Sequence, residues 1–207
     1  MYVNGDLVTV KAVSPRPRVA SDAQIFEALH RVICRLGPAR MTLADVGAEV
    51  GVTAAALVQR YGSKRGLFLA AARVSMTEFK GHVLAIRAAH PSPIAALTEY
   101  AAAAARYTRT PDELANQLAM FQLDLTDPEF HALGLAFFRA ERKELKAMLD
   151  DAVAAAEVRA GTDTRAVARM VQVSMNGGRL VWAVLREGSL ERWMRRDLEV
   201  LLEPYRA

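Results

Sequence analysis

Apolar residues recur at helical spacing along most of this chain. After Ser21 they fall four residues apart at Ile25 and Leu29, on what would be one face of a helix. Ser21 and Gln24 stand at the spacing of a capping box, and Gly37-Pro38 is a pair typical of helix ends. The pattern predicts three short helices in this part of the chain, over residues 22–36, 43–50 and 54–60.

The helical period continues to the C-terminus and is interrupted by prolines and glycines. Pro91 and Pro93 break the chain after a long fourth helix, and Gly161 closes another. Thr110 and Thr126 are each followed closely by a proline and an acidic residue, a pattern typical of helix starts. Because we find no convincing pair of strands and no internal repeat, the predicted fold class is all-α. The helices expected in this part cover residues 64–89, 93–107, a segment from 110, 126–159, 164–186 and 190–203.

Residues 41–68 carry the most specific pattern. Thr42 and Asp45 stand at capping-box spacing, Gly51 lies where the chain must reverse, and Thr53 can cap a second short helix. Two short helices joined by a tight glycine turn form the helix-turn-helix layout, whose second helix enters the major groove of DNA. We therefore divide the chain into a basic arm over residues 1–20, a helix-turn-helix domain over 21–66 and a C-terminal helical bundle over 67–207.

The distribution of charge agrees with DNA binding by the N-terminal domain. The 207 residues carry a formal charge of +4, and residues 1–65 hold nine Lys or Arg against five Asp or Glu. The remaining residues carry equal numbers of bases and acids, so the whole excess lies beside the predicted helix-turn-helix, where DNA phosphates would need it. A hydrophobic content of 52% indicates an ordered globular protein.

The N-terminal arm contains Lys11, Arg16 and Arg18. Arginines on a flexible arm can enter the minor groove of DNA, as they do in homeodomains. Minor-groove contact is therefore one hypothesis for the arm, and a disordered leader with stray charges is the alternative.

Several other classes of function lack the residues they need. The four histidines lie far apart without acidic partners at ligand spacing, so we expect no metal, no cofactor and no catalytic residue. Cys34 is the single cysteine and is expected to be a small buried hydrophobe, with redox sensing as the alternative. Because the sequence has no membrane-spanning stretch and no signal peptide, we expect a cytoplasmic, nucleoid-associated protein without membrane contact.

Taken together, these features resemble the TetR (tetracycline-repressor) family of transcriptional regulators. The resemblance implies a homodimer in which each subunit joins a small DNA-binding domain to a divergent helical ligand-binding domain. In that family, a ligand in the C-terminal pocket shifts the fourth helix and the protein leaves its operator. The resemblance is architectural only from residue 71 on and strong over residues 21–70, where it is carried by Thr42, Asp45-Val46-Gly47, Gly51-Val52-Thr53, Leu57, Tyr61, Ser63-Lys64 and Leu67.

The resemblance and the chemistry of the side chains together give candidate contacts to a double-stranded DNA operator. Thr42 and Lys64 each begin a helix, where the helix dipole and the free amides favour phosphate. Gln59 can make two hydrogen bonds to adenine, whereas Arg60 can reach a phosphate or a guanine. The residues expected to face the base edges are Thr53, Ala54, Ala55 and Gln59.

Two positions depart from the family pattern. Val58 stands where the family commonly has a tyrosine that contacts phosphate, and Gly66 stands where an acidic or polar residue is usual. A glycine at this position would cost the helix about 1 kcal/mol relative to alanine. With the alanine face of the second helix, these departures predict few direct base contacts and a specificity that relies on DNA shape or on the arm.

A pocket for an unknown small-molecule effector is also implied by the resemblance. Such a cavity needs mostly apolar walls and a few placed polar groups. The alternative for each aromatic or methionine residue is that it belongs to the plain core. The candidate effector residues are Met120, Phe121, Asp124, His131, Phe137, Phe138, Met175, Asn176 and Trp182.

The resemblance places the dimer interface on the last two long helices, over residues 164–186 and 190–203. Gly177 and Gly178 lie inside the first of these, where glycine weakens a helix, so close packing at the dimer interface is expected there, with a ligand-induced kink as the alternative. The residues that suit burial between subunits are Met170, Val171, Leu180, Val184, Trp193, Leu198 and Leu201.

The function predicted from the sequence is a ligand-responsive repressor that binds a palindromic operator as a homodimer. Two alternatives remain. One is an enzyme built on a helical bundle, which the lack of a nucleophile–base set disfavours. The other is an interaction module that keeps the fold but no longer binds specific DNA, and Val58 favours it.

Overall fold

The computed structural model describes residues 20–207, so the predicted contacts of Lys11, Arg16 and Arg18 in the arm lie outside the described residues. Within that range the chain is helical apart from loops and an isolated antiparallel bridge between Val158 and Arg206, which confirms the all-α fold class. None of the helices in residues 20–207 combines the length and the apolar composition needed to cross a membrane.

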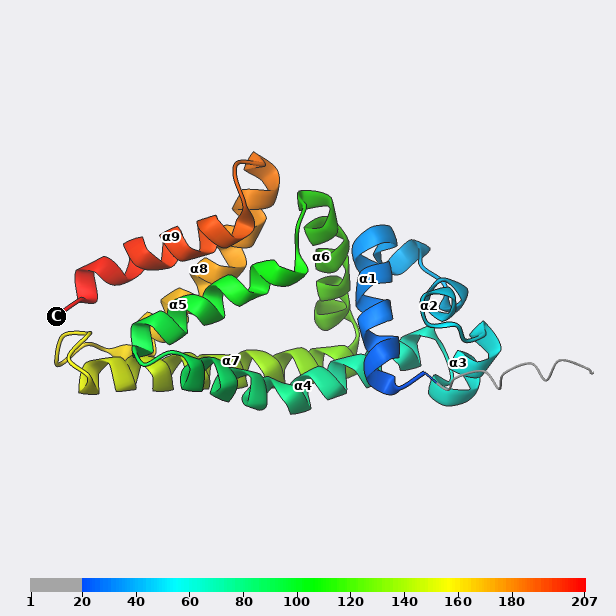
Figure 1. The fold of residues 1–207 in the computed structure, drawn as a ribbon, viewed down its shortest axis with the longest axis horizontal. Coiled ribbons are helices and arrows are strands. Elements are labelled where there is room, and N and C mark those ends of the chain that lie inside the picture. Colours follow the sequence, from blue (N-terminus) through cyan, green and yellow to red (C-terminus); the bar gives the residue numbers. More distant parts are fainter. Residues whose placement is uncertain (1–19) are drawn as a thin grey trace, which may run out of the picture.

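The helices follow one another in the order that the sequence predicts. Figure 1 shows α1, α2 and α3 gathered at one end of an elongated molecule, with α4 running away from them along one edge beside α7. The elements are α1 (Asp22–Arg40), α2 (Leu43–Val50), α3 (Ala54–Tyr61), α4 (Lys64–Ala89), α5 (Pro93–Ala103), η1 (Ala104–Tyr107), α6 (Pro111–Thr126), α7 (Pro128–Ala154), α8 (Thr164–Leu185), α9 (Leu190–Leu202) and η2 (Glu203–Tyr205).

Helix α1 extends past its predicted end at residue 36 but is broken near that point. Gly37 has φ +73°, outside the helical region, and Pro38 begins a final turn that ends at Arg40. A Cβ atom on Gly37 would lie only 2.7 Å from the Oδ1 atom of Asn116 in α6. The glycine therefore allows both the change of direction and the close approach of α1 to α6.

The start of α7 differs from the prediction by one residue. Thr126 belongs to the end of α6, where its hydroxyl donates to the carbonyl of Gln122. Asp127 caps α7 instead and accepts hydrogen bonds from the amides of Glu129 and Phe130. The reason is that Pro128 occupies the first helical position, which makes the preceding residue the cap.

Two helix ends also fall earlier than predicted. Helix α7 ends at Ala154 and not near residue 159, because Ala156 adopts φ +54° and turns the chain. Helix α8 ends at Leu185, and Arg186 takes a left-handed conformation with φ +58°. Neither end is marked by a glycine, so the sequence offers no strong local signal at these positions.

The buried side chains form an N-terminal core and a larger C-terminal core. Ile25, Leu57 and Leu67 from α1, α3 and α4 fill the N-terminal core, and Phe130 from α7 is buried among them. Leu97, Leu145 and Val171 belong to the C-terminal core. Because α7 contributes to both cores, the N-terminal helices are packed directly onto the C-terminal bundle.

Two residues that were expected at a dimer interface lie inside one subunit. Val171 and Leu198 are only 0% and 2% exposed and pack within the C-terminal core, so the prediction that they meet a partner is wrong. They occupy the faces of α8 and α9 that turn toward α5 and α7. Met170, Leu180 and Val184 lie on the outer face of α8 and are exposed.

Candidate nucleic-acid interface

The start of α2 has the reciprocal hydrogen bonds of a capping box. The Thr42 hydroxyl oxygen accepts from the Asp45 amide at 3.2 Å, and an Asp45 carboxylate oxygen accepts from the Thr42 amide at 2.7 Å. The hydrogen bonds that Thr42 donates lower the pKa of Asp45 below its ordinary value. Thr42 itself is exposed, so its side chain lies at the surface at the start of α2.

The turn between α2 and α3 requires glycine at two positions. Gly51 has φ +72° and ψ +30°, a left-handed conformation that glycine adopts without steric cost. Gly47 lies beneath the turn, where a Cβ atom would be 2.3 Å from the Val52 carbonyl oxygen. The amide of Val52 also donates to the carbonyl of Gly47 at 3.0 Å. The backbone contact fixes the angle at which α3 leaves the turn.

Helix α3 buries one side and exposes the other. Thr53 caps the helix by accepting from the Ala56 amide at 3.1 Å, and Leu57 is buried in the N-terminal core. Ala55 and Gln59 are exposed, as the base-contact hypothesis requires, and Ala54 is partly buried. Val58 is 46% exposed, which is unusual for an apolar residue on a surface that would meet DNA. The predicted base contacts therefore share an accessible face with Val58.

Arg60 is engaged within the protein and points toward the start of α1. Its guanidinium donates to the Ala20 carbonyl at 2.7 Å and pairs with the Asp22 carboxylate at 2.9 Å. The hydroxyl of Tyr61 also donates to Asp22, and burial together with this hydrogen bond raises the pKa of Tyr61. These contacts tie the end of α3 to the beginning of α1, where the N-terminal arm joins the domain.

Lys64 lies next to Thr42, the other predicted phosphate contact. Its ammonium group donates to the carbonyl of Met41 at 2.8 Å and approaches the carbonyl of Ala39 at 3.4 Å. The ammonium also lies 6.0 Å from the ring centre of Phe68. The structure thus brings Lys64 and Thr42, which are far apart in the sequence, to one edge of the helix-turn-helix.

Gly66 is explained by a close backbone contact. A Cβ atom at this position would lie 2.0 Å from the carbonyl oxygen of Tyr61, far closer than a Cβ atom approaches a non-bonded oxygen. Ser63 caps α4 by accepting from the Gly66 amide at 3.0 Å. The departure from the family pattern is therefore a packing requirement of this chain, because α3 and α4 meet too closely for a side chain.

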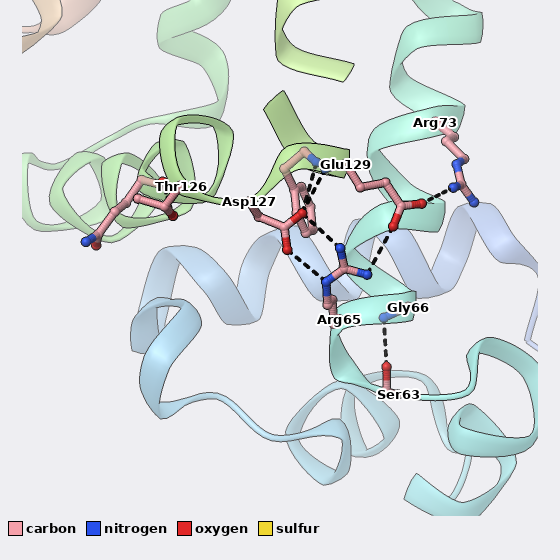
Figure 2. Close-up of polar contacts among 9 residues, drawn as sticks. Ser63, Arg65, Gly66, Arg73, Thr126, Asp127 and Glu129 are labelled. Carbon is pink, nitrogen blue, oxygen red and sulfur yellow. Dashed lines mark hydrogen bonds and ion pairs between the residues drawn. The ribbon is translucent and has the colours of Figure 1, made fainter. Parts of the chain in front are cut away.

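Figure 2 shows a cluster of ion pairs that connects α4 to the start of α7. The Arg65 guanidinium donates to both carboxylate oxygens of Asp127, at 3.0 Å and 2.9 Å, and to Glu129 at 3.1 Å. Glu129 also pairs with Arg73, which lies about two turns after Arg65 in α4. The bond from Arg65 lowers the pKa of Asp127, and the bond to Asp127 raises the pKa of Arg65. The cluster holds the first turns of α4 against α7.

A second polar connection joins α1 to α6. Asn116 donates to the carbonyl of Cys34 at 2.7 Å, and the Gln117 amide donates to the Cys34 sulfur at 3.1 Å. Arg179 of α8 donates to the side-chain oxygen of Gln117 at 3.3 Å. Cys34 is buried, as predicted, and burial raises the pKa of its thiol. Side chains thus connect α8 to α1 through α6.

The predicted effector residues are distributed over several parts of the structure. Phe121, Phe137 and Phe138 lie edge to face at the junction of α6 and α7. The ring centre of Phe138 lies 5.7 Å from that of Phe137 and 5.9 Å from that of Phe121. Met175 is buried in the C-terminal core and Trp182 in a separate small cluster.

The other effector candidates lie around this junction. Met120 packs on the N-terminal core, and Asn176 is exposed and donates to the carbonyl of Gln172. Asp124 is partly buried, and this burial raises the pKa of its carboxyl. His131 is exposed and contacts the Asp124 carbonyl. Neither the groove of about 590 Å³ between α8 and α9 nor a hollow of about 190 Å³ beside His90 has any of these residues in its lining.

A buried polar network in the C-terminal core was not predicted. Glu141 is 5% exposed and accepts hydrogen bonds from the Tyr100 hydroxyl and the Gln172 amide, both at 2.8 Å. Nearby, the Nε atom of Arg179 is buried and has no hydrogen-bond partner among the described residues. Burial lowers the pKa of Arg179, and Glu141 opposes this shift. Buried polar groups of this kind are rare without a role, and helical periodicity alone gave no signal for them.

No group of three or more metal-ligating side chains lies together in residues 20–207. The model that describes bacterial regulatory proteins of the tetR family matches residues 25–71, which span the helix-turn-helix and the start of α4. No curated protein matches the chain.

Solved structures resemble the chain over most of its length. A TetR transcription regulator from Haloarcula marismortui has 18% identity and a TM-score of 0.74, with 90% of this chain and 98% of that chain covered. A TetR-family regulator from Agrobacterium tumefaciens has 17% identity, a TM-score of 0.71 and coverage of 90% and 97%. The regulator FadR from Bacillus subtilis, in complex with stearoyl-CoA, has 15% identity, a TM-score of 0.63 and coverage of 87% and 97%.

Replacement of Gly66 by alanine should destabilise the protein, because the added methyl group collides with the Tyr61 carbonyl. We expect a loss of about 1–3 kcal/mol in the free energy of unfolding. Gly81 is the matched control, since it also lies in α4 but a Cβ there would meet nothing within 4 Å. Gly81→Ala should stabilise the protein by about 0.5–1 kcal/mol. Chemical denaturation measures the free energy of unfolding of both variants. If Gly66→Ala stabilises the protein as Gly81→Ala does, the close contact between Gly66 and the Tyr61 carbonyl is contradicted.

Asp127→Asn should weaken the connection between α4 and α7 while keeping the oxygen that caps α7. The folded-state pKa of Asp127 lies below the ordinary 3.8, so its contribution is present at neutral pH and is lost as the pH falls through the folded-state value. We expect the variant to melt below the wild type at pH 7 and the difference to shrink below about pH 4.

Asp163→Asn is the control for this experiment. Asp163 also caps a helix, α8, and has no ion-pair partner among the described residues. Its replacement should leave the melting temperature nearly unchanged at both pH values. A melting difference for Asp127→Asn that does not depend on pH would show that the charge of Asp127 plays no part.

Proposed function

We propose that the chain is a DNA-binding transcriptional repressor of the TetR type, because the model of the tetR family matches residues 25–71 and solved TetR regulators share the fold. In this proposal two subunits bind a palindromic operator, and a small ligand in the C-terminal domain releases them. The observation that carries it is the accessible face of α3, flanked by Thr42 and Lys64 at one edge of the domain. Repression is the simpler outcome, because occupying a promoter blocks polymerase without any further contact.

Each candidate residue has a distinct role at the DNA. Lys64 and Thr42 stand beside the N-termini of α4 and α2, so they would bind phosphates and set the position of the domain. Gln59 would bond a base edge, whereas Ala54 and Ala55 would contact only thymine methyl groups. Thr53 would reach a base or a phosphate at the start of α3. With two α3 helices in successive major grooves, the half-site centres would lie about 34–36 Å apart.

Arg60 fits a supporting role better than base reading. To reach DNA it would have to leave both the Ala20 carbonyl and the Asp22 carboxylate. We assign it to holding α3 against α1. Direct readout then depends on few side chains, and sequence-dependent DNA shape would supply more of the specificity.

The route from an effector to the DNA would run through α6 and α7. These helices carry the aromatic residues Phe121, Phe137 and Phe138 and also contact the DNA-binding helices through Asp127 and Gln117. A ligand that separated α6 from α7 would therefore move α1 and α4. The FadR structure contains stearoyl-CoA, which supports ligand binding by proteins of this fold.

A homodimer through α8 and α9 is part of the proposal. Both helices carry exposed apolar residues, Met170, Leu180 and Val184 in α8 among them and Val200 in α9. In Figure 1 the two helices lie away from α2 and α3. Burial of such a surface by a second copy would be favourable because it removes apolar area from water.

An interaction module that no longer binds specific DNA is the second candidate. Val58 favours it, because an exposed apolar side chain at the centre of α3 contributes no bond to phosphate or base. In that case the polar edge formed by Thr42 and Lys64 would have no nucleic-acid partner.

Lys64→Ala tests DNA binding directly. Binding of the purified protein to sheared genomic DNA is measured over a range of salt concentrations by fluorescence anisotropy. Because one phosphate contact is lost from each subunit, we expect weaker binding and a reduction of about two in the slope of log affinity against log salt. Lys80→Ala, in the same helix but exposed further from the DNA-binding helices, should leave the slope unchanged.

Equal behaviour of the two variants would remove Lys64 from the interface. No measurable DNA binding by a folded wild-type dimer would favour the interaction module. Circular dichroism of both variants checks that the helical fold is intact, so that loss of binding is not loss of folding.

A further inference from the structure

Arg179 of α8 is a partly buried cation that leaves most of its hydrogen-bond donors unused within residues 20–207. A guanidinium carries five N–H donors. The one hydrogen bond that Arg179 makes there goes to the side-chain oxygen of Gln117, and at 3.3 Å it is long for such a bond. Its Nε atom is buried and has no partner in this part of the chain. Because burial of a cation without compensation is costly, this arrangement needs a reason.

The nearby carboxylate of Glu141 does not compensate Arg179 by direct contact. One Glu141 oxygen accepts from the Tyr100 hydroxyl and the other from the Gln172 amide, both at 2.8 Å. Gln172 in turn accepts from the Arg142 guanidinium at 2.9 Å. The network therefore holds two guanidinium groups and one carboxylate. Water can solvate the excess charge at Arg142, which is exposed, but reaches Arg179 less well.

Apolar side chains lie close to this cation, where α6, α7 and α8 pack against one another. On α6, Gln117 is one turn before Phe121, and on α7, Glu141 is one turn after Phe138. The two phenylalanine rings meet edge to face with their centres 5.9 Å apart. Phe121 is 39% exposed, so the ring pair lies nearer the surface than the buried Nε atom. A molecule that entered between the rings would meet apolar groups first and the guanidinium further in.

We propose that Arg179 binds the carboxylate of an organic acid with an apolar body, and that this acid is the effector. The body of the acid would pack between Phe121 and Phe138, in the manner of a site with apolar walls and one placed charge. This inference rests on the ligand-responsive repressor of the proposed function.

A carboxylate fits this site better than other anions do. It matches the planar fork of a guanidinium and can accept two parallel hydrogen bonds from it. It would thus use the donors that Arg179 leaves unused and neutralise the one excess charge of the network. A phosphate monoester carries up to two negative charges, and the second would lie uncompensated beside Glu141.

The proposed site is connected to α1 through Gln117. The Gln117 amide nitrogen donates to the Cys34 sulfur at 3.1 Å and to the Tyr107 carbonyl at 2.7 Å. A carboxylate bound to Arg179 would replace the long bond from the guanidinium to Gln117. Binding of the acid would therefore alter the one side-chain connection from α8 through α6 to α1 that is described above.

Matched acids and amides test the requirement for a carboxylate. Hexanoate and phenylacetate are compared with hexanamide and phenylacetamide, which have the same bodies without the charge. Thermal denaturation of the full-length wild type is measured with each compound at neutral pH, where the acids are ionised. At least one acid should raise the melting temperature by more than its amide does, because a ligand that binds the folded state stabilises it. If neither acid does so, the carboxylate site is wrong.

Replacement of Arg179 locates the site. Arg179→Met keeps much of the apolar stem and removes the charge, so the affinity for the active acid should fall at least about tenfold by isothermal titration calorimetry. Arg179→Lys keeps the charge without the planar fork and should bind with intermediate affinity. Arg169→Met, at an exposed position of the same helix, should bind as the wild type does. Undiminished binding by Arg179→Met would place the acid elsewhere and overturn the site.

The measurements separate the acid site from the repressor. Acid binding is measured without DNA, and its effect on the affinity for sheared genomic DNA is then measured by fluorescence anisotropy. A lower DNA affinity with the acid bound is the expected result, and an unchanged affinity would show that the acid is not the effector. If the protein binds specific DNA but neither acid, the repressor stands and the acid site is wrong. If Arg179 binds an acid but the protein binds no DNA, the proposed function fails and the site stands.

Discussion

At both ends of α3 the backbone meets a neighbouring segment so closely that only a hydrogen atom fits on the α-carbon. Before the helix, Gly47 lies under the Val52 carbonyl, and after it Gly66 lies under the Tyr61 carbonyl. Close packing of this kind fixes orientation more firmly than flexible side chains do, because backbone atoms have no alternative rotamers. The direction of α3, and hence what it presents to DNA, depends on these two contacts together with the bonds of Arg60 to α1.

The C-terminal bundle is coupled to this rigid unit at two places. Asp127 caps α7 and pairs with Arg65 in α4, while Gln117 of α6 contacts both Cys34 in α1 and Arg179 in α8. A change in the packing of α6 and α7 would thus reach α1 and α4 together. This arrangement gives the proposed effector response a physical route, since allostery needs an element whose position both sites influence.

The sequence predicts well those features that depend on neighbouring residues. The caps at Ser21, Thr42 and Thr53 involve residues three positions apart, and all of them are present in the structure. The helix-turn-helix follows from the same local signals. The one misplaced cap, Thr126, lies beside a proline whose position decides between two adjacent candidates.

Features that depend on contacts between residues distant in the sequence could not be predicted from these local signals. Arg60 is engaged by residues about forty positions away in the chain, and the collision that requires Gly66 exists only once α3 and α4 are packed. Similarly, periodicity shows that α8 has apolar residues on more than one face, but it does not decide which face is inside. For this reason Val171 was placed at the dimer interface although it belongs to the core.

Sequencing of the DNA that the protein retains from a pool of genomic fragments tests the central claim most directly. The pool should include the DNA upstream of the protein's own gene. The account predicts enrichment of one palindromic motif with half-sites about one helical turn apart, read by two α3 helices. If the retained fragments share no motif and their binding depends only on the salt concentration, the account is contradicted.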